Sequence, residues 1–259
     1  MSSAWVGGEH AARVPDAPRT LAEDVFAQLR GDIVRGRFQP GAKLGLDALR
    51  AAYGVGISPL REALSRLVAE GLVRQESQRG FRVAPASLPD LEDIARNRIR
   101  LESDALRLSI ANGDDSWGAR LVAAHYQFGR SEYRKASGDG ADPEEWEVRH
   151  RAFHRTLIDA CGSRWLLHFC EQLYDQFDRY RRLCDISADT QRHLGTHHTA
   201  MMDAALARDA DRAAAILGEH IGQTAAAMVD SLGRLAQSGP RTGPQPSPAR
   251  IAAPVVRKP

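Results

Sequence analysis

Cysteine is scarce in this 259-residue chain, and a long apolar run is missing. The three cysteines, Cys161, Cys170 and Cys184, show no C-x-x-C spacing and cannot all pair with one another, which predicts reduced thiols. No apolar stretch approaches the roughly 18 residues that a membrane-spanning helix needs. The segment from Met1 to Pro18 also lacks the apolar core of a secretory signal. We therefore expect a cytoplasmic protein with no membrane partner.

Net charge is small as well, because 35 Lys and Arg residues nearly balance 33 Asp and Glu residues. Basicity alone therefore does not indicate a nucleic-acid partner. The charge is uneven, however, and residues 19–86 carry 11 basic against 7 acidic side chains, which favours a DNA-binding module there. We expect disordered tails at residues 1–18 and 236–259, the second rich in proline and free of acidic residues.

Residues 19–86 contain three predicted helices. The first begins at the capping box Thr20-Leu-Ala-Glu23, and its apolar stripe is formed by Leu21, Val25, Leu29 and Ile33. A short second helix spans residues 46–53 and stops at Gly54. The third has Ser58 as its N-cap and Pro59 at its first helical position, and it ends at Gly71. Two helices joined by a tight glycine turn predict a helix-turn-helix.

Two strand-like runs, residues 72–76 and 81–84, follow the third helix and predict a small β-hairpin wing. The first turns of a recognition helix contact bases, whereas hydroxyls, amides and arginines contact phosphates. An arginine at a hairpin tip can enter the minor groove. The predicted DNA-binding residues are therefore Ser58, Arg61, Arg66, Arg79 and Gly80. In the alternative interpretation, Ser58 only caps the helix and Arg61 only pairs with a nearby carboxylate.

The remainder of the chain, residues 87–235, shows helical periodicity throughout and no strand pattern. Short breaks separate six predicted helices, at residues 88–112, 115–136, 142–161, 164–184, 188–208 and 210–235. Such short connections are typical of antiparallel neighbours in a bundle. The predicted fold is mainly α, with an N-terminal winged helix-turn-helix followed by an all-α antiparallel bundle of six or seven helices.

Five polar side chains fall on the apolar stripes of this bundle: Arg98, His150, His154, His198 and His220. A buried polar group without a partner costs about 1–3 kcal/mol, so these side chains need partners. His150 and His154 are four residues apart on one helix face, and His198 and His220 come from two other helices. One divalent transition metal, such as zinc or nickel, would serve all four imidazoles. We place Arg98 nearby as the residue that binds a carboxylate effector.

The N-terminal residues resemble the DNA-binding domain of the GntR family. The resemblance is carried by Pro40-Gly41, Ser58-Pro-Leu-Arg-Glu-Ala-Leu64, Glu70-Gly71-Leu72-Val73 and Arg79-Gly80. The family often has Arg where Ile57 stands, and Arg or Glu where Asp47 stands. The operator sequence therefore does not follow from the commonest members.

The C-terminal half is similar to the FCD ligand-binding domain of the FadR subfamily, and the resemblance covers about residues 20–230 in all. Arg98-x-x-Leu101-Glu102 resembles the opening motif of that domain, and His154, His198 and His220 match its three metal histidines. His150 stands where the family usually has Asp, which changes the charge of the ligand set. The pattern around Trp146 and Cys161-Gly-Ser163 is closest to the branch of carbon-starvation-induced repressors that respond to glutarate. The resemblance implies a homodimer that binds a palindromic operator in double-stranded DNA.

The expected function is a DNA-binding transcription regulator, a repressor released by a small carboxylate or dicarboxylate. One alternative is a metal-dependent enzyme. Zinc proteases need H-E-x-x-H, but here Arg151 follows His150. A di-iron bundle needs two Glu-x-x-His motifs, and this sequence has one, Glu147-x-x-His150. We therefore expect no enzyme. The other alternative is a DNA-architectural protein whose helical half only dimerises.

Overall fold

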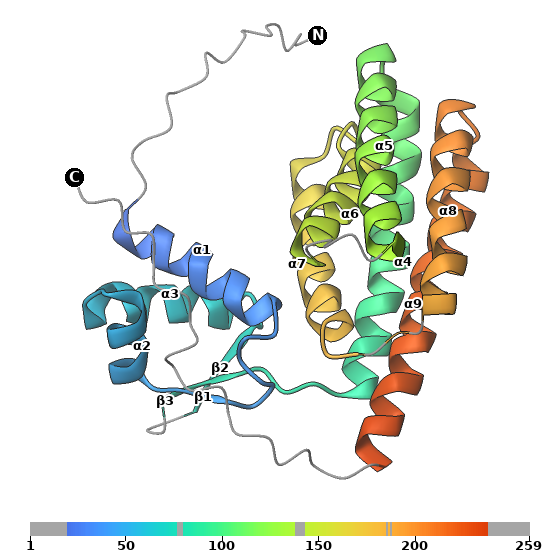
Figure 1. Cartoon of the computed structure of the whole chain (residues 1–259). Helices are drawn as coiled ribbons and strands as arrows, with labels where there is room; N and C mark the ends of the chain where they lie inside the picture. Colours follow the sequence, from blue (N-terminus) through green and yellow to red (C-terminus); the bar gives the residue numbers. More distant parts are fainter. Residues whose placement is uncertain (1–19, 77–79, 138–142, 185, 187, 238–259) are drawn as a thin grey trace, which may run out of the picture.

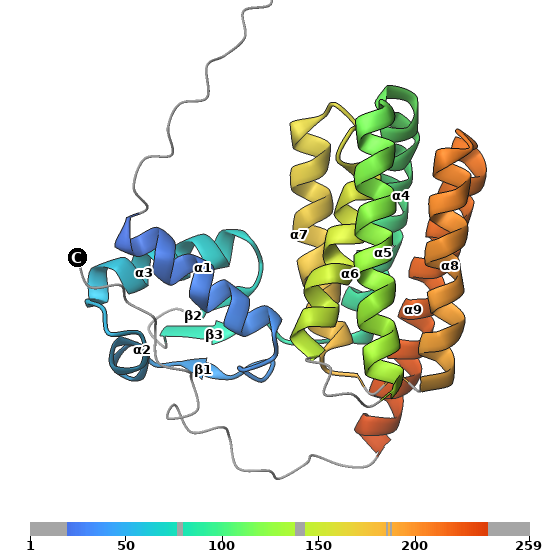
Figure 2. The ribbon, with the colours of Figure 1, turned by 45° about the horizontal axis from the view of Figure 1, so that its top comes forward.

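The structure, a computed structural model, describes residues 20–76, 80–137, 143–184, 186 and 188–237 (Figure 1). The two predicted tails lie outside these residues, apart from residues 236–237, which belong to the last helix. Two hydrophobic cores form, one within residues 25–83 and the other within residues 91–228. Both views separate a small α/β module from a tall helical bundle (Figures 1 and 2).

The N-terminal module has the winged helix-turn-helix architecture that the sequence predicts. Its helices are α1 (Leu21–Val34), α2 (Leu46–Tyr53) and α3 (Ile57–Ala69), and its strands are β1 (Lys43–Leu44), β2 (Val73–Glu76) and β3 (Gly80–Val83). All strand pairs are antiparallel, in the order β1-β3-β2. The pattern predicted β2 and β3 but missed β1, since two residues are too few to show an alternation.

Local signals explain how these helices begin and end. Both bonds of the predicted capping box form, between the Thr20 hydroxyl and the Glu23 amide and between the Glu23 carboxylate and the Thr20 amide. Gly54 ends α2 in the left-handed conformation that glycine adopts without steric cost. Leu21 is an exception to the predicted stripe, because it is the first residue of α1 and its side chain is 52% exposed.

The predicted N-cap of α3 is wrong by two residues. The helix begins at Ile57. Its N-cap is Gly56, whose backbone is extended and which has no side chain to make a capping hydrogen bond. Ser58 and Pro59 therefore lie inside the first turn. Backbone N–H groups there have no partner within the helix, so the N–H that proline lacks is not missed. The Ser58 side chain is exposed and its hydroxyl does not cap the helix.

The bundle consists, within the described residues, of six helices that follow one another without a strand. They are α4 (Leu88–Asn112), α5 (Asp115–Ser137), α6 (Pro143–Ile158), α7 (Arg164–Arg181), α8 (Ala188–Leu206) and α9 (Ala210–Gln237). Helix α4 packs against α9, α7 and α6, while α8 lies on α9 and α5 (Figure 2). In the described part of the chain, no helix is both long and apolar enough to cross a bilayer.

Helix α7 joins the bundle to the winged module. Asp175 of α7 is buried and forms ion pairs with Arg30 of α1 and with Arg151 of α6. Arg30 also binds Glu70, the residue at the end of α3, and Gln176 donates a hydrogen bond to the Glu70 carbonyl at 2.8 Å. The end of the predicted recognition helix is thus tied to a helix of the bundle.

Candidate metal centre and adjoining cavity

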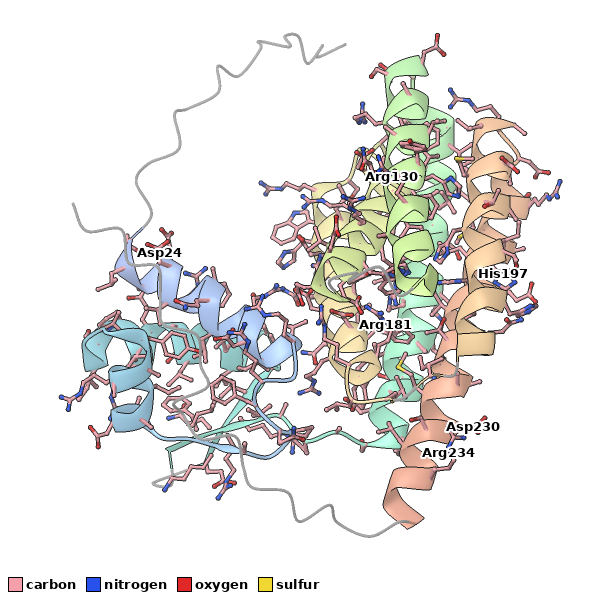
Figure 3. All side chains as sticks on the ribbon, viewed as in Figure 1. Asp24, Arg130, Arg181, His197, Asp230 and Arg234 are labelled. Atoms are coloured by element: carbon pink, nitrogen blue, oxygen red, sulfur yellow. The ribbon has the colours of Figure 1, made fainter. Side chains whose placement is uncertain are left out.

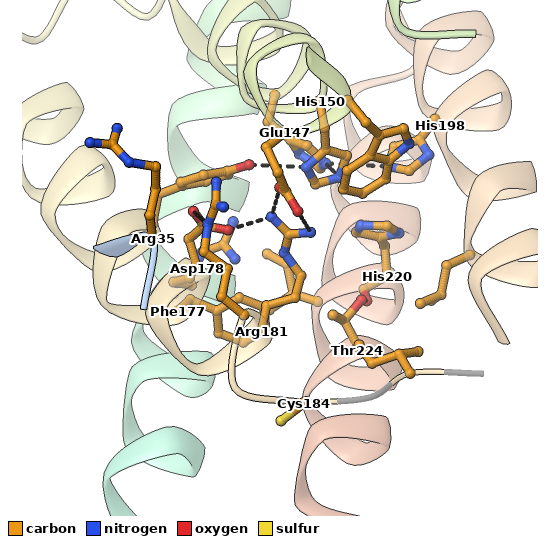
Figure 4. Close-up of a pocket in the computed structure, with 18 residues that line it drawn as sticks. Arg35, Glu147, His150, Phe177, Asp178, Arg181, Cys184, His198, His220 and Thr224 are labelled. Atoms are coloured by element: carbon orange, nitrogen blue, oxygen red, sulfur yellow. Dashed lines mark hydrogen bonds and ion pairs between the residues drawn. The ribbon is translucent and has the colours of Figure 1, made fainter. Parts of the chain in front are cut away.

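Four histidines from three helices of the bundle converge on one point. His150 and His154 lie one turn apart on α6, His198 lies on α8 and His220 on α9, and all four are buried. One nitrogen of each ring lies within 4.8 Å of one nitrogen of every other ring. The close-up shows the rings of His150, His198 and His220 on one side of the cavity, across from Arg35 (Figure 4). The structure therefore brings together the whole set that the sequence predicts.

The distances in this cluster suit a coordinated metal ion. The Nε2 atom of His154 lies 3.1 Å from that of His150 and 3.3 Å from that of His198. Metal–nitrogen bonds of about 2.0–2.1 Å in a tetrahedron place neighbouring donors about 3.3–3.4 Å apart. Neutral rings alone cannot satisfy both contacts, because the His154 Nε2 atom either donates one hydrogen bond or accepts one, and it has two neighbours. The residues present therefore fit a metal ion.

The environment keeps the imidazoles neutral, as metal binding requires. Burial lowers the pKa of all four histidines, and the charge that each neighbouring ring would carry adds to the effect. The pKa of His198 falls to about 3, mainly by burial. On the far side of the His150 ring, Nδ1 lies 3.0 Å from the Tyr174 hydroxyl, a contact that fixes the ring orientation.

These pKa shifts predict that the metal-free protein loses stability below pH 6.5, the ordinary pKa of histidine. Below that pH the unfolded chain takes up protons that the buried rings do not, which favours unfolding by up to about 1.4 kcal/mol per pH unit and ring. The free energy of unfolding in urea, measured on metal-stripped protein at about pH 7.5 and about pH 5.5, should therefore fall on acidification.

The matched control is the variant with His154→Ala and His198→Ala, which carries two fewer of the depressed groups. Its free energy of unfolding should depend less steeply on pH than that of the wild type. Equal slopes for the two proteins would show that these rings are not buried in their neutral form.

A cavity of about 350 Å³ adjoins the histidines. Arg98 lines it, as the sequence predicts, but its guanidinium is already engaged. Its Nε and Nη2 atoms donate to the two carboxylate oxygens of Glu102 at 2.6 and 2.9 Å, and both side chains are buried. The spacing of Arg98 and Glu102, four residues apart on one helix, was the sequence signal for this pair.

Arg181 is a cavity residue that the sequence analysis missed (Figures 3 and 4). Its guanidinium binds the carboxylates of Glu147 and Asp178 and lies over the Trp146 ring. Burial alone lowers its pKa, but the charges of Asp178 and Glu147 outweigh that effect and raise it, so Arg181 stays cationic. Among the described lining residues are four arginines and two carboxylates, and each of the four guanidiniums already pairs with at least one carboxylate.

The structure describes four of the five predicted DNA-contacting residues. Ser58 and Arg61 are exposed in the first turns of α3. Arg66 is exposed as well, and its guanidinium lies 4.0 Å from the centre of the Phe26 ring, so it also has a packing role in the module. Gly80 begins β3 with a φ of 88°, while Arg79 lies outside the described residues.

Comparison with known proteins places both halves of the chain. The family described as bacterial regulatory proteins, gntR family, matches residues 21–83, and the FCD domain matches residues 93–223. The regulator BphR of Paraburkholderia xenovorans (strain LB400) is 42% identical over 225 residues, which cover 85% of this chain and 92% of BphR. The chain belongs to the GntR family. Its FCD domain marks it as a member of the FadR-like subfamily.

Other relatives of this GntR protein agree. The transcriptional repressor GlaR of Escherichia coli (strain K12) is 39% identical over 202 residues, covering 76% of this chain and 91% of GlaR. The solved structure of E. coli McbR/YncC has the same fold, with a TM-score of 0.72 at 23% identity over 83% of this chain and all of that one. The protein is thus a DNA-binding transcription regulator with an effector-binding domain. These relatives also confirm that it is not an enzyme.

Proposed function

We propose that this regulator is a homodimeric, metal-dependent repressor that a small dicarboxylate releases from its operator. The observation that supports the proposal is the joint placement of four buried imidazoles and four arginines on one cavity. His150, His154, His198 and His220 would hold zinc or nickel, and the bound metal would offer open positions to a carboxylate oxygen. Arg98 and Arg181 would stabilise the negative charge of the ligand.

The size of the cavity and the arginines in its lining favour a small acid. A volume of about 350 Å³ lies near the lower end of the range of ligand pockets, about 300–1,000 Å³, and suits a short-chain acid. The resemblance to the glutarate-responsive branch and the repressor name of GlaR agree with a dicarboxylate and with repression. Two winged modules of a dimer would read the two half-sites of a palindromic operator, with Ser58, Arg61, Arg66, Arg79 and Gly80 as the contacts.

Helix α7 supplies a physical route from the ligand to the DNA. One of its faces lines the cavity through Tyr174, Phe177 and Asp178, whereas Asp175 and Gln176 contact the winged module. A ligand that prefers one placement of α7 would therefore favour one orientation of the winged module. Such coupling between two sites typically amounts to 1–3 kcal/mol, or about 5–150-fold in affinity.

The test is the operator affinity of the metal-loaded protein, measured by fluorescence anisotropy on an operator selected from random DNA. Succinate, glutarate and adipate, together with hydroxy acids, form the panel of ligands. At least one dicarboxylate should weaken operator binding by about 5–150-fold. The metal-stripped protein is the control and should respond less. An operator affinity that no acid of the panel changes would refute the proposal, and the purely architectural role would then be favoured.

A further inference from the structure

The wall of the cavity includes a residue of the DNA-binding module. Arg35 follows α1 as its C-cap and lies at the rim of the cavity, across from the histidines (Figure 4). Four residues line both this cavity and a smaller neighbouring space, namely Arg35, Glu147, Asp178 and Arg182. The other wall of the smaller space includes Arg30, Gly31 and Val34 of α1. The cavity therefore continues into the junction between the two domains.

Arg35 is held less firmly than the other arginines of the cavity. Its Nη2 atom donates to Asp32 at 2.7 Å, while its buried Nε atom has no hydrogen-bond partner. Arg98, by contrast, makes a two-bonded pair with Glu102, and Arg181 binds two carboxylates. The Nε atom is covered where it stands, so an anion in the cavity would meet the guanidinium of Arg35 once this side chain turns toward it.

Asp32 does not depend on Arg35 for a partner. This fully buried carboxylate also accepts a hydrogen bond from the Tyr53 hydroxyl at 2.7 Å and pairs with Arg37 at 2.9 Å. Arg35 can therefore turn away from Asp32 without leaving a buried charge unpaired. Space for this side chain comes from Gly31, where a Cβ atom would lie 2.9 Å from the Arg35 guanidinium.

We propose that Arg35 binds the second carboxylate of a dicarboxylate whose first carboxylate is held beside the histidine cluster. The inference rests on the proposed function and adds a ligand contact from the DNA-binding module. A ligand bound in this way would touch both domains at once. Its binding free energy would then depend on the orientation of the winged module, which is the condition for regulating DNA binding.

The test compares two variants in the full-length, metal-loaded protein. Arg35→Ala and Arg37→Ala each remove one guanidinium from the same carboxylate, Asp32, but Arg37 does not line the cavity. Glutarate and pentanoate serve as probes in isothermal titration calorimetry, because they share a five-carbon chain and differ in one terminal carboxylate. Arg35→Ala should weaken glutarate binding about tenfold and leave pentanoate binding unchanged, as expected for one charge-assisted contact. Arg37→Ala should bind both acids like the wild type.

The outcomes separate this inference from the proposed function. If the wild type binds glutarate and Arg35→Ala binds it no more weakly than Arg37→Ala does, the Arg35 contact is refuted and the proposed function stands. An equal loss of glutarate and pentanoate binding in Arg35→Ala would also refute it, since it would indicate a general disturbance of the site. If no dicarboxylate binds to the wild type, the proposed function and this contact both fail.

Discussion

Replacing His154 and His198 together by alanine should abolish metal binding in the purified protein. The two rings come from different helices and their Nε2 atoms lie 3.3 Å apart, and their removal leaves two of four donors. Changing a group that merely orients a ligand already lowers metal affinity about 10–100-fold, and losing two ligands must cost more. Elemental analysis by mass spectrometry should find about one metal ion per wild-type chain and only background in the variant.

The matched control removes two other histidines from the same stretch of α8, by His193→Ala and His197→Ala. His193 is exposed and His197 is half-buried, and neither belongs to the cluster. This control should retain its metal. Added metal should stabilise the wild type and the control, by about 2.7 kcal/mol at a free concentration 100 times the Kd, but not the cluster variant. Full metal occupancy in the cluster variant would place the site elsewhere.

Replacing Arg61 by alanine should weaken operator binding about tenfold to a hundredfold. Arg61 is exposed in the first turns of α3, where a recognition helix meets base edges, and a two-bonded arginine–guanine contact amounts to about 1–3 kcal/mol. Fluorescence anisotropy on the selected operator at fixed salt measures this loss, and the metal content should stay unchanged. On random DNA the loss should be smaller, because a base contact contributes to specificity more than to general affinity.

Arg120→Ala provides the comparison for this experiment. Arg120 is an exposed arginine of α5 that pairs with Asp159 of the bundle, so the variant loses the same charge far from α3. Its operator affinity should match that of the wild type. Equal affinities for Arg61→Ala and Arg120→Ala would remove Arg61 from the DNA interface and favour its alternative role as a surface ion-pair partner.

Much of the fold follows from local patterns. The capping box at Thr20, the glycine after α2 and the apolar periodicities fix the helices to within a few residues, because these signals act over one or two turns. The missed strand β1 and the misplaced start of α3 have a different origin. Lys43 and Leu44 become a strand only because β3 lies beside them, and that neighbour is distant in the sequence.

The candidate site divides in the same way. The four histidines were predictable, because polar residues on apolar stripes need a partner, and the spacing of His150 and His154 already defines a chelating pair. The placement of Arg181 and Arg35 at the cavity was not predictable. Arg181 occurs in a run of charged residues at the end of α7, and only the packing of α6 against that end brings Glu147 to it.

The sequence by itself determined the order of the helices, the two-part organisation, the family and the four histidines of the cluster, because each depends on residue type and short-range spacing. The tertiary structure decided which arginines line the cavity and that Arg98 forms an ion pair with Glu102. It also decided that the winged module contributes Arg35 to the rim of the cavity. These features depend on how rigid helices dock on one another. Docking is set by contacts between residues as far apart as Arg30 and Asp175, for which no short-range pattern exists.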